Sequence, residues 1–229
     1  MWKLIVDRVL QNISSLLSLT ILFLIIAGTG KVWGFWIYLT TVLVYQVVSL
    51  LYILPRYPAY LELARVRRER RSDVKKWDRV LVFLLMGVTF LMYGMAAYDV
   101  GRAHLSQLPL WLAPLGILLY AAGTALNQWA MIANPHFEKG VRIQTDRAHQ
   151  VIAAGPYRYV RHPGYLGSLL GFVSFPLIVG SGVALLGSAL CMLGMMVRTG
   201  YEDQTLRMEL AGYAEYAQAV RYRLIPYIW

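Results

Sequence analysis

GYLGSLLGFVSFPLIVGSGVALLGSALCMLGMMV, residues 164–197, is a run of 34 residues without a single charged side chain. About 20 apolar residues suffice for one membrane-spanning helix, so this run is too long for one span. Pro176 interrupts it, and Gly180-Ser181-Gly182 gives a turn signal shortly afterwards. The run therefore predicts two shorter helices joined by a tight turn, which brings their outer ends close together.

Four further uncharged runs precede this hairpin, and each is long enough for one helix: 9–30, 32–54, 80–98 and 105–133. Hydrophobic residues make up 58% of the chain, whereas a soluble domain has roughly 45–50% apolar residues. The composition predicts an all-α integral membrane protein with about six transmembrane helices. Lys3 and Arg8 also allow a cleaved secretory signal, but the first run is long for one, so we expect it to be the first helix.

The basic residues predict the orientation in the membrane. If the N-terminus is cytoplasmic, only Lys31 and Arg102 of the 22 lysines and arginines lie on the far side. We therefore expect both termini in the cytoplasm, with the protein in the bacterial inner membrane, or in the endoplasmic reticulum of a eukaryote. The net charge of +10 follows from this arrangement and does not indicate nucleic acid.

The insert at 56–79 carries nine basic and four acidic residues. Such a segment is typical of a cytoplasmic loop that also rests on anionic lipid headgroups. The alternative is that the insert binds an anionic substrate or partner.

The chain changes character after residue 133, although we expect one structural domain overall. Residues 1–133 predict four transmembrane helices with the basic loop, and residues 134–229 predict a catalytic loop, the helical hairpin and an amphipathic tail. The loop at 134–164 contains several prolines and glycines, so it cannot be one continuous helix, though an extended segment could lie within 141–155.

The tail, 201–229, has one apolar helical face and predicts a cap over the cytoplasmic ends of the spans. Gly212 interrupts the pattern, which favours two short helices over one. The face consists of Leu206, Leu210, Tyr213, Ala217, Val220 and Leu224.

Charged residues gather where the hairpin should open. Arg161 and His162 stand at the entrance of its first helix, and we expect Arg198, Glu202 and Asp203 to close its second. Such residues at a membrane boundary are costly unless they are paired or face a wet cavity, so the group predicts a functional site. The alternative is that the arginines extend to lipid phosphates.

Metal binding is not expected. The four histidines lack the spacing of metal ligands, and Cys191 stands alone in an apolar run.

The motif GPYRYVRHPGYLG at 155–167, with E-D-x-x-L at 202–206 and a tyrosine-rich tail ending in LIP, resembles the isoprenylcysteine carboxyl methyltransferases and their bacterial relatives. Those enzymes share a membrane fold with phospholipid N-methyltransferases. The resemblance covers roughly residues 134–229. It implies S-adenosylmethionine as the methyl donor, bound on the cytoplasmic side by the C-terminal half.

The resemblance also implies roles for individual residues. Arg161 would orient the methyl acceptor and, with Glu202 and His162, act in catalysis. Arg198, which the hairpin should return to the same entrance, is predicted as a second substrate-binding residue. The cofactor would be held by Gly155, Pro156, Tyr157, His162, Pro163, Tyr165, Glu202 and Asp203. Asp203 replaces the second glutamate of the family motif, and Tyr213 and Tyr216 follow Leu210-Ala211-Gly212 rather than the family's aromatic-glycine pair, which leaves their role open.

The resulting hypothesis is a membrane methyltransferase that acts on a carboxylate, amine or thiol of a lipidic or isoprenoid acceptor entering from the bilayer. Methyl transfer from a sulfonium is an in-line displacement that requires alignment, and with a carboxylate acceptor a dry pocket should favour it. An amine or thiol would in addition need a base. The alternatives are an NADPH-dependent membrane reductase of the sterol-reductase type and a non-enzymatic membrane protein.

Overall fold

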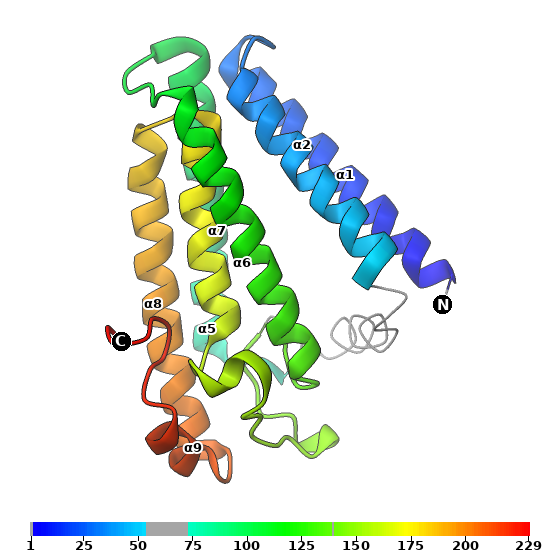
Figure 1. Ribbon diagram of the computed structural model, residues 1–229, viewed down its shortest axis with the longest axis vertical. Helices are drawn as coiled ribbons and strands as arrows, with labels where there is room; N and C mark the ends of the chain where they lie inside the picture. The colour runs from blue at the N-terminus through cyan, green and yellow to red at the C-terminus, as the bar shows by residue number, and fades with distance from the viewer. Residues whose placement is uncertain (1, 54–72, 139) are drawn as a thin grey trace.

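The computed structural model describes residues 2–53, 73–138 and 140–229 (Figure 1). Most of the basic insert therefore lies outside the described residues, and its role stays a prediction. The described α-helices are α1 (Trp2–Ala27), α2 (Trp33–Val48), α5 (Lys76–Tyr98), α6 (Ala113–Ala133), α7 (Pro163–Val179), α8 (Val183–Glu209) and α9 (Tyr213–Ala219).

In the described part of the chain, five helices are long and apolar enough to cross a membrane: Val9–Ala27, Trp33–Leu51, Lys76–Ala103, Leu110–Ala133 and Val183–Glu209. Many large apolar side chains on these helices are exposed, among them Leu17, Phe83 and Leu186. Such a surface suits lipid rather than water. About six spans were predicted; the remaining candidate is the shorter α7, which has 17 residues.

The hairpin predicted from 164–197 is confirmed. Pro163 occupies the first turn of α7, where its missing N–H costs nothing, and Gly180 ends the helix with a left-handed φ of 87°. α8 begins three residues later, at Val183, so the turn is tight. Pro176 lies in the last turn of α7 and does not divide it.

A buried carboxylate ties this turn to the preceding loop. Asp99 accepts hydrogen bonds from the Leu105 N–H (2.8 Å), the Ser106 hydroxyl (2.9 Å) and the Ser181 hydroxyl (2.6 Å). Residues 104–109 are used in this contact, so the helix expected over 105–133 begins only with a 3₁₀ turn at Leu110–Leu112 and α6 at Ala113.

The end of α8 differs from the prediction. Arg198, Glu202 and Asp203 do not close the helix, because it continues to Glu209. The first of the two short helices expected in the tail is thus the end of α8, and α9 is the second. Gly212, with φ of 80°, makes the bend between them. The extended segment considered within 141–155 is absent among the described residues, which form irregular loop with a 3₁₀ turn at Thr145–Arg147.

Close helix packing positions α7. A Cβ on Gly167 would lie 2.5 Å from the Gly123 carbonyl oxygen, and a Cβ on Gly123 would lie 2.5 Å from the Gly167 carbonyl oxygen. Small residues at such crossings let helix backbones approach closely within a membrane. Gly167, the last residue of the sequence motif, therefore serves to pack α7 on α6.

The α1–α2 pair meets the other helices mainly at one end. Gly34 of α2 abuts the backbone of Val179, and Gly101 abuts Ala27 of α1. Phe23 and Phe35 stack there, with ring centroids 3.9 Å apart, in the largest hydrophobic core. Figure 1 shows α1 and α2 leaning away from the bundle toward the opposite end, where α9 lies. The helices therefore diverge toward the candidate site.

Replacing Gly167 with alanine should weaken the α6–α7 contact. The added methyl group would overlap a backbone carbonyl, which costs typically about 1–3 kcal/mol of unfolding free energy. Gly171→Ala on the same helix is the matched control, because nothing lies within 4 Å of its added Cβ. Thermal unfolding in detergent should show a lower midpoint for Gly167→Ala alone, and equal midpoints for both variants would contradict this packing.

Candidate functional site

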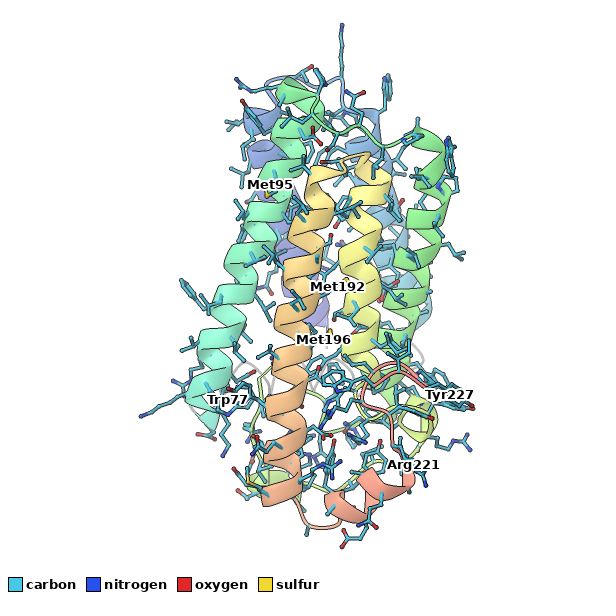
Figure 2. All side chains as sticks on the ribbon, turned by 90° about the vertical axis from the view of Figure 1, so that its left-hand side faces the viewer. Trp77, Met95, Met192, Met196, Arg221 and Tyr227 are labelled. Carbon is cyan, nitrogen blue, oxygen red and sulfur yellow. The ribbon has the colours of Figure 1, made fainter. Side chains whose placement is uncertain are left out.

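The C-terminal tail folds back over the entrance of α7. The Arg161 N–H donates to the Tyr222 carbonyl and the His162 N–H donates to the Arg223 carbonyl, each at 2.9 Å. Leu224 is 1% exposed and packs against Leu169 of α7. Figure 2 shows Arg221 beside α9 and Tyr227 at the side of the bundle, so the tail runs back along the helices. The tail is thus part of the site's framework.

Asp203 holds this framework together. Its fully buried carboxylate receives the Arg161 guanidinium at 2.7 and 3.1 Å, Nε of Arg207 at 3.1 Å and Nε of Arg223 at 3.1 Å. The Tyr213 hydroxyl donates to it at 3.0 Å. Charge-assisted hydrogen bonds of this kind are the strongest in proteins, and a buried charge requires them. One side chain of α8 therefore fixes the α7 entrance, α9 and the tail.

Arg161 is committed to structural contacts. Besides Asp203, its guanidinium Nη1 donates to the Val220 carbonyl at 2.7 Å and the Arg221 carbonyl at 2.8 Å. The residue is 4% exposed. This geometry makes Arg161 an anchor of the tail at the cavity wall, which differs from the acceptor-orienting role predicted for it.

A polar cavity with an empty volume of about 790 Å³ opens beside this framework. Its walls come from the 134–152 loop, the 157–165 segment, the end of α8 and the region from Leu210 to Tyr216. Tyr157, Arg161, His162, Tyr165 and Glu202, all predicted site residues, line it. The structure therefore brings five of the ten predicted site residues to one cavity.

Two contacts organise the predicted residues within this cavity. The Tyr165 hydroxyl donates a hydrogen bond to the Glu202 carboxylate. The His162 ring stacks parallel on the Tyr165 ring, with centroids 5.6 Å apart, and its Nε2 lies 3.4 Å from the Tyr213 hydroxyl. Tyr216 closes the wall, where its hydroxyl donates to the Tyr157 carbonyl at 2.7 Å.

Other predicted residues lie behind the cavity wall. Gly155, Pro156, Pro163 and Asp203 do not line it. Gly155 adopts a left-handed φ of 59°, and a Cβ there would lie 2.9 Å from the Ala133 Cβ. These residues set the path of the backbone around the cavity, whereas Asp203 holds its supports.

The 134–152 loop supplies wall residues that sequence reasoning did not single out. Arg142 is held by Glu138 through two hydrogen bonds, at 2.8 and 2.9 Å, and by Asp146 at 2.9 Å. The rings of His136 and His149 lie 4.6 Å apart. The sequence indicated only that a loop of this length is usually functional. The i, i+4 spacing of these charges was the available signal.

An apolar cavity with an empty volume of about 1520 Å³ lies between α1 and the bundle of α5 to α8. Its walls are mainly aliphatic and aromatic, and it borders the polar cavity at Phe137, Glu138, Gly164 and Tyr165, which line both. The structure thus places a polar space directly against an apolar one.

Arg198, another predicted site residue, lines the apolar cavity together with Tyr165. Its Nε donates to Asp78 at 2.7 Å, and its guanidinium lies 4.9 Å from the centroid of the Tyr165 ring. Asp78 also accepts the Val141 N–H at 2.8 Å, so it joins α5 to the loop. Asp78 was not predicted as the partner of Arg198, because in the sequence it is one of several charged residues of the basic insert.

No group of three or more histidine, cysteine, aspartate or glutamate side chains among the described residues could hold a metal ion. The polar cavity instead offers carboxylate, hydroxyl and aromatic groups. These groups suit an organic ligand that carries positive charge.

Residues 111–211 match the family model described as phospholipid methyltransferase. Protein-S-isoprenylcysteine O-methyltransferase B of Arabidopsis thaliana is 26% identical over 113 residues, which cover 48% of this chain and 57% of that protein. A probable protein-S-isoprenylcysteine O-methyltransferase of Oryza sativa subsp. indica is 30% identical over 117 residues, covering 50% and 61%. The chain thus matches less than two thirds of the length of these curated relatives.

The cobalt-zinc-cadmium resistance protein CzcN of Cupriavidus metallidurans is 29% identical over 170 residues, covering 72% of this chain and 69% of that protein. Among solved structures, the eukaryotic intramembrane Ras methyltransferase ICMT aligns with 93% of this chain and 74% of its own, at a TM-score of 0.51 and 18% identity. That likeness establishes a shared fold. The family resemblance predicted from 155–167 is confirmed by the family match and the relatives.

Removing the charge of Asp203 should loosen the cap. Asp203→Asn keeps the shape of the side chain but leaves buried arginine charge uncompensated, an effect typically worth about 3–5 kcal/mol of stability. Limited proteolysis should then cleave within 210–229. Glu209→Gln is the control, because its ion pair with Lys75 is partly exposed and worth about 0–1 kcal/mol. Equal protease resistance in both variants would contradict the structural role of Asp203.

The loop should lose stability in mild acid. Burial, with the neighbouring His136, lowers the pKa of His149 to about 4, and burial also lowers the pKa of His136. An unfolded histidine titrates near 6.5, so the stabilisation is complete above about pH 6.5 and is lost as the pH falls toward 4. Thermal unfolding between pH 7.5 and 5 should show a falling midpoint.

His149→Asn, which cannot titrate, should flatten this dependence, whereas His104→Gln, exposed in the loop after α5, should leave it unchanged. A profile that is the same in His149→Asn and the unaltered protein would contradict the assignment.

Proposed function

We propose that the protein is a membrane methyltransferase that transfers a methyl group from S-adenosylmethionine to a lipidic or isoprenoid acceptor, since residues 111–211 match the phospholipid methyltransferase family model. The observation that carries the proposal is the meeting of the polar and apolar cavities at Tyr165. A water-soluble donor and an apolar acceptor need such a junction, because the donor enters from water and the acceptor's hydrocarbon chain stays in an apolar environment.

The polar cavity suits the donor. Its walls carry carboxylate, hydroxyl and aromatic groups from four segments of the chain, which can fix the polar parts of a small organic ligand. Glu202 supplies negative charge for the donor's ammonium or sulfonium group, and Tyr165 holds that carboxylate in place. The rings of Tyr157, Tyr213 and Tyr216 give flat surfaces for an adenosine moiety. When bound, S-adenosylmethionine supplies a methyl group on a positively charged sulfur.

The apolar cavity suits the acceptor's hydrocarbon chain. Arg198 lines it close to the junction, where the guanidinium, fixed by Asp78 and the Tyr165 ring, can orient a carboxylate. We assign the orienting role to Arg198 rather than to Arg161, whose guanidinium is committed to Asp203 and to the tail. Arg161 is then a positioning residue.

The chain's contribution to the reaction is alignment and the exclusion of water. An in-line displacement gains most from holding the reacting groups in register, which the rigid α7–α8 hairpin supports. For a carboxylate acceptor, opposite charges disappear in the step, so a dry junction favours it. For an amine or thiol acceptor, Glu202 or His162 at the junction could take the proton.

The same proposal includes six spans with both termini in the cytoplasm. α7 packs along α6 through Gly123 and Gly167 and returns through a tight turn into α8, which supports its crossing as the sixth span. The α1–α2 connection, which contains Lys31, and the α5–α6 connection, which contains Arg102, lie at the end of the bundle opposite α9, whereas α8 ends beside α9 with Arg207 in its last turn (Figure 1). The α9 end, with its cofactor cap, is then cytoplasmic.

A reductase is a weaker alternative. The 2′-phosphate of NADPH needs positive charge, but Arg142 and Arg161 on the polar cavity are compensated by Glu138, Asp146 and Asp203. A phosphate at this wall would meet carboxylates as well as guanidinium groups. The balance of charge therefore favours a cationic ligand.

Titration of the purified protein should detect binding of S-adenosylmethionine and none of NADPH. Glu202→Gln should weaken donor binding roughly 10- to 100-fold, because a hydrogen bond to a charged group is worth about 1.5–3 kcal/mol. Glu215→Gln, exposed on α9, is the control and should bind normally. Binding of NADPH with no binding of S-adenosylmethionine would overturn the proposed function.

A further inference from the structure

One face of α5 forms a continuous wall of the apolar cavity. The lining residues recur at helical spacing: Val82, Leu85, Met86, Thr89, Phe90 and Tyr93. From the first to the last, the helix rises about 16 Å at roughly 1.5 Å per residue. The cavity is therefore long as well as wide, and it runs parallel to the helices.

The near end of this wall lies at the reaction site. Asp78, one turn before Val82 on α5, binds Arg198 at 2.7 Å, and Arg198 lies against Tyr165. Tyr165 also lines the polar cavity. The depth along α5 is counted from Val82, the first lining residue, one turn beyond the Asp78–Arg198 pair.

At its far end, this wall meets a cluster of aromatic rings from three helices. Tyr93 lies 4.1 Å, centroid to centroid, from the Phe175 ring of α7. Its hydroxyl is 2.7 Å from the hydroxyl of Tyr38 of α2, whose own ring lies 4.9 Å from Phe175. Tyr38 and Phe175 are buried in the largest core, so they hold Tyr93 in place.

We propose that this wall measures the acceptor's apolar chain, and that Tyr93, held by Tyr38 and Phe175, sets the greatest length that is accepted. An extended hydrocarbon advances about 1.25 Å per bond, given bonds of about 1.5 Å at tetrahedral angles. The available depth of about 16 Å then accepts a main chain of roughly a dozen carbons. Three isoprene units, with twelve main-chain carbons, match this length. The inference rests on the proposed function, because it assigns the apolar cavity to the acceptor.

Substitutions at two depths should move the limit in opposite directions. Tyr93→Ala removes the ring that closes the cavity and should extend the accepted chain by about four carbons, the length of a phenol group at about 1.25 Å per bond. Thr89→Phe, one turn nearer the junction, should shorten it by a similar amount. Tyr93→Phe keeps the ring and should leave the limit unchanged. Tyr98→Ala, exposed near the end of α5, is the matched control.

The test measures binding and methyl transfer with N-acetyl-S-alkylcysteines whose chains have 8, 10, 12, 14, 16 and 20 carbons. Affinity should rise about fourfold per methylene, the gain for burying one CH₂, and should stop rising near 12 carbons in the unaltered protein. The break should move to longer chains in Tyr93→Ala and to shorter chains in Thr89→Phe. Folding of each variant is checked by its thermal unfolding midpoint in detergent, which does not depend on the proposed function.

The outcomes separate this inference from the proposed function. A break near 12 carbons in binding that moves with both substitutions supports the length limit even if no methyl group is transferred, a result that would count against the proposed function alone. Methyl transfer with affinity rising steadily to 20 carbons, or with the break unmoved in folded Tyr93→Ala and Thr89→Phe, would overturn the length limit and leave the proposed function standing.

Discussion

The buried carboxylate of Asp203 is the contact on which the rest of the site depends. It lies on α8 and binds Arg161 before α7, Arg207 one turn along and Arg223 in the tail, all within 3.1 Å. A lone buried charge would be strongly unfavourable, so these partners must stay together for the fold to be stable. Their meeting also fixes His162 and Tyr165, which follow Arg161 directly into the wall of the polar cavity.

This constraint explains why conspicuous residues of the motif do not all face a ligand. Arg161 at the cavity wall neutralises Asp203 behind it, whereas Glu202 and Tyr165, one position from Asp203 and four from Arg161, face the cavity without such a partner in Asp203. Adjacent residues on a helix point about 100° apart, so one of a pair of acids can hold the structure while the other serves the ligand. On α8, Glu202 faces the cavity and Asp203 holds the surrounding structure.

The placement of polar and apolar space follows from helix packing. Glycines bring α6 and α7 into backbone contact, and other glycines join α1 and α2 to the bundle at the end remote from α9. Below that contact, the α1–α2 pair leans away from the bundle (Figure 1). An apolar cavity lies between α1 and α5 and reaches the polar cavity at Tyr165 of α7, beside the ion pair of Asp78 on α5 with Arg198 on α8. A single junction can then serve a polar and an apolar reactant.

The sequence by itself determined the helical membrane class, the α7–α8 hairpin and the importance of 155–167, because long uncharged runs, a glycine turn and a dense motif are local properties. Gly212 likewise indicated the bend before α9. The pairing of Asp78 with Arg198, 120 residues apart, was beyond its reach, as was the extension of α8 past Asp203. The spacing of Glu138 and Arg142 was visible in the sequence, but not their place in the cavity wall. Only the tertiary structure decided which charges neutralise one another and which face a cavity, since a carboxylate's role depends on the partners that folding places around it.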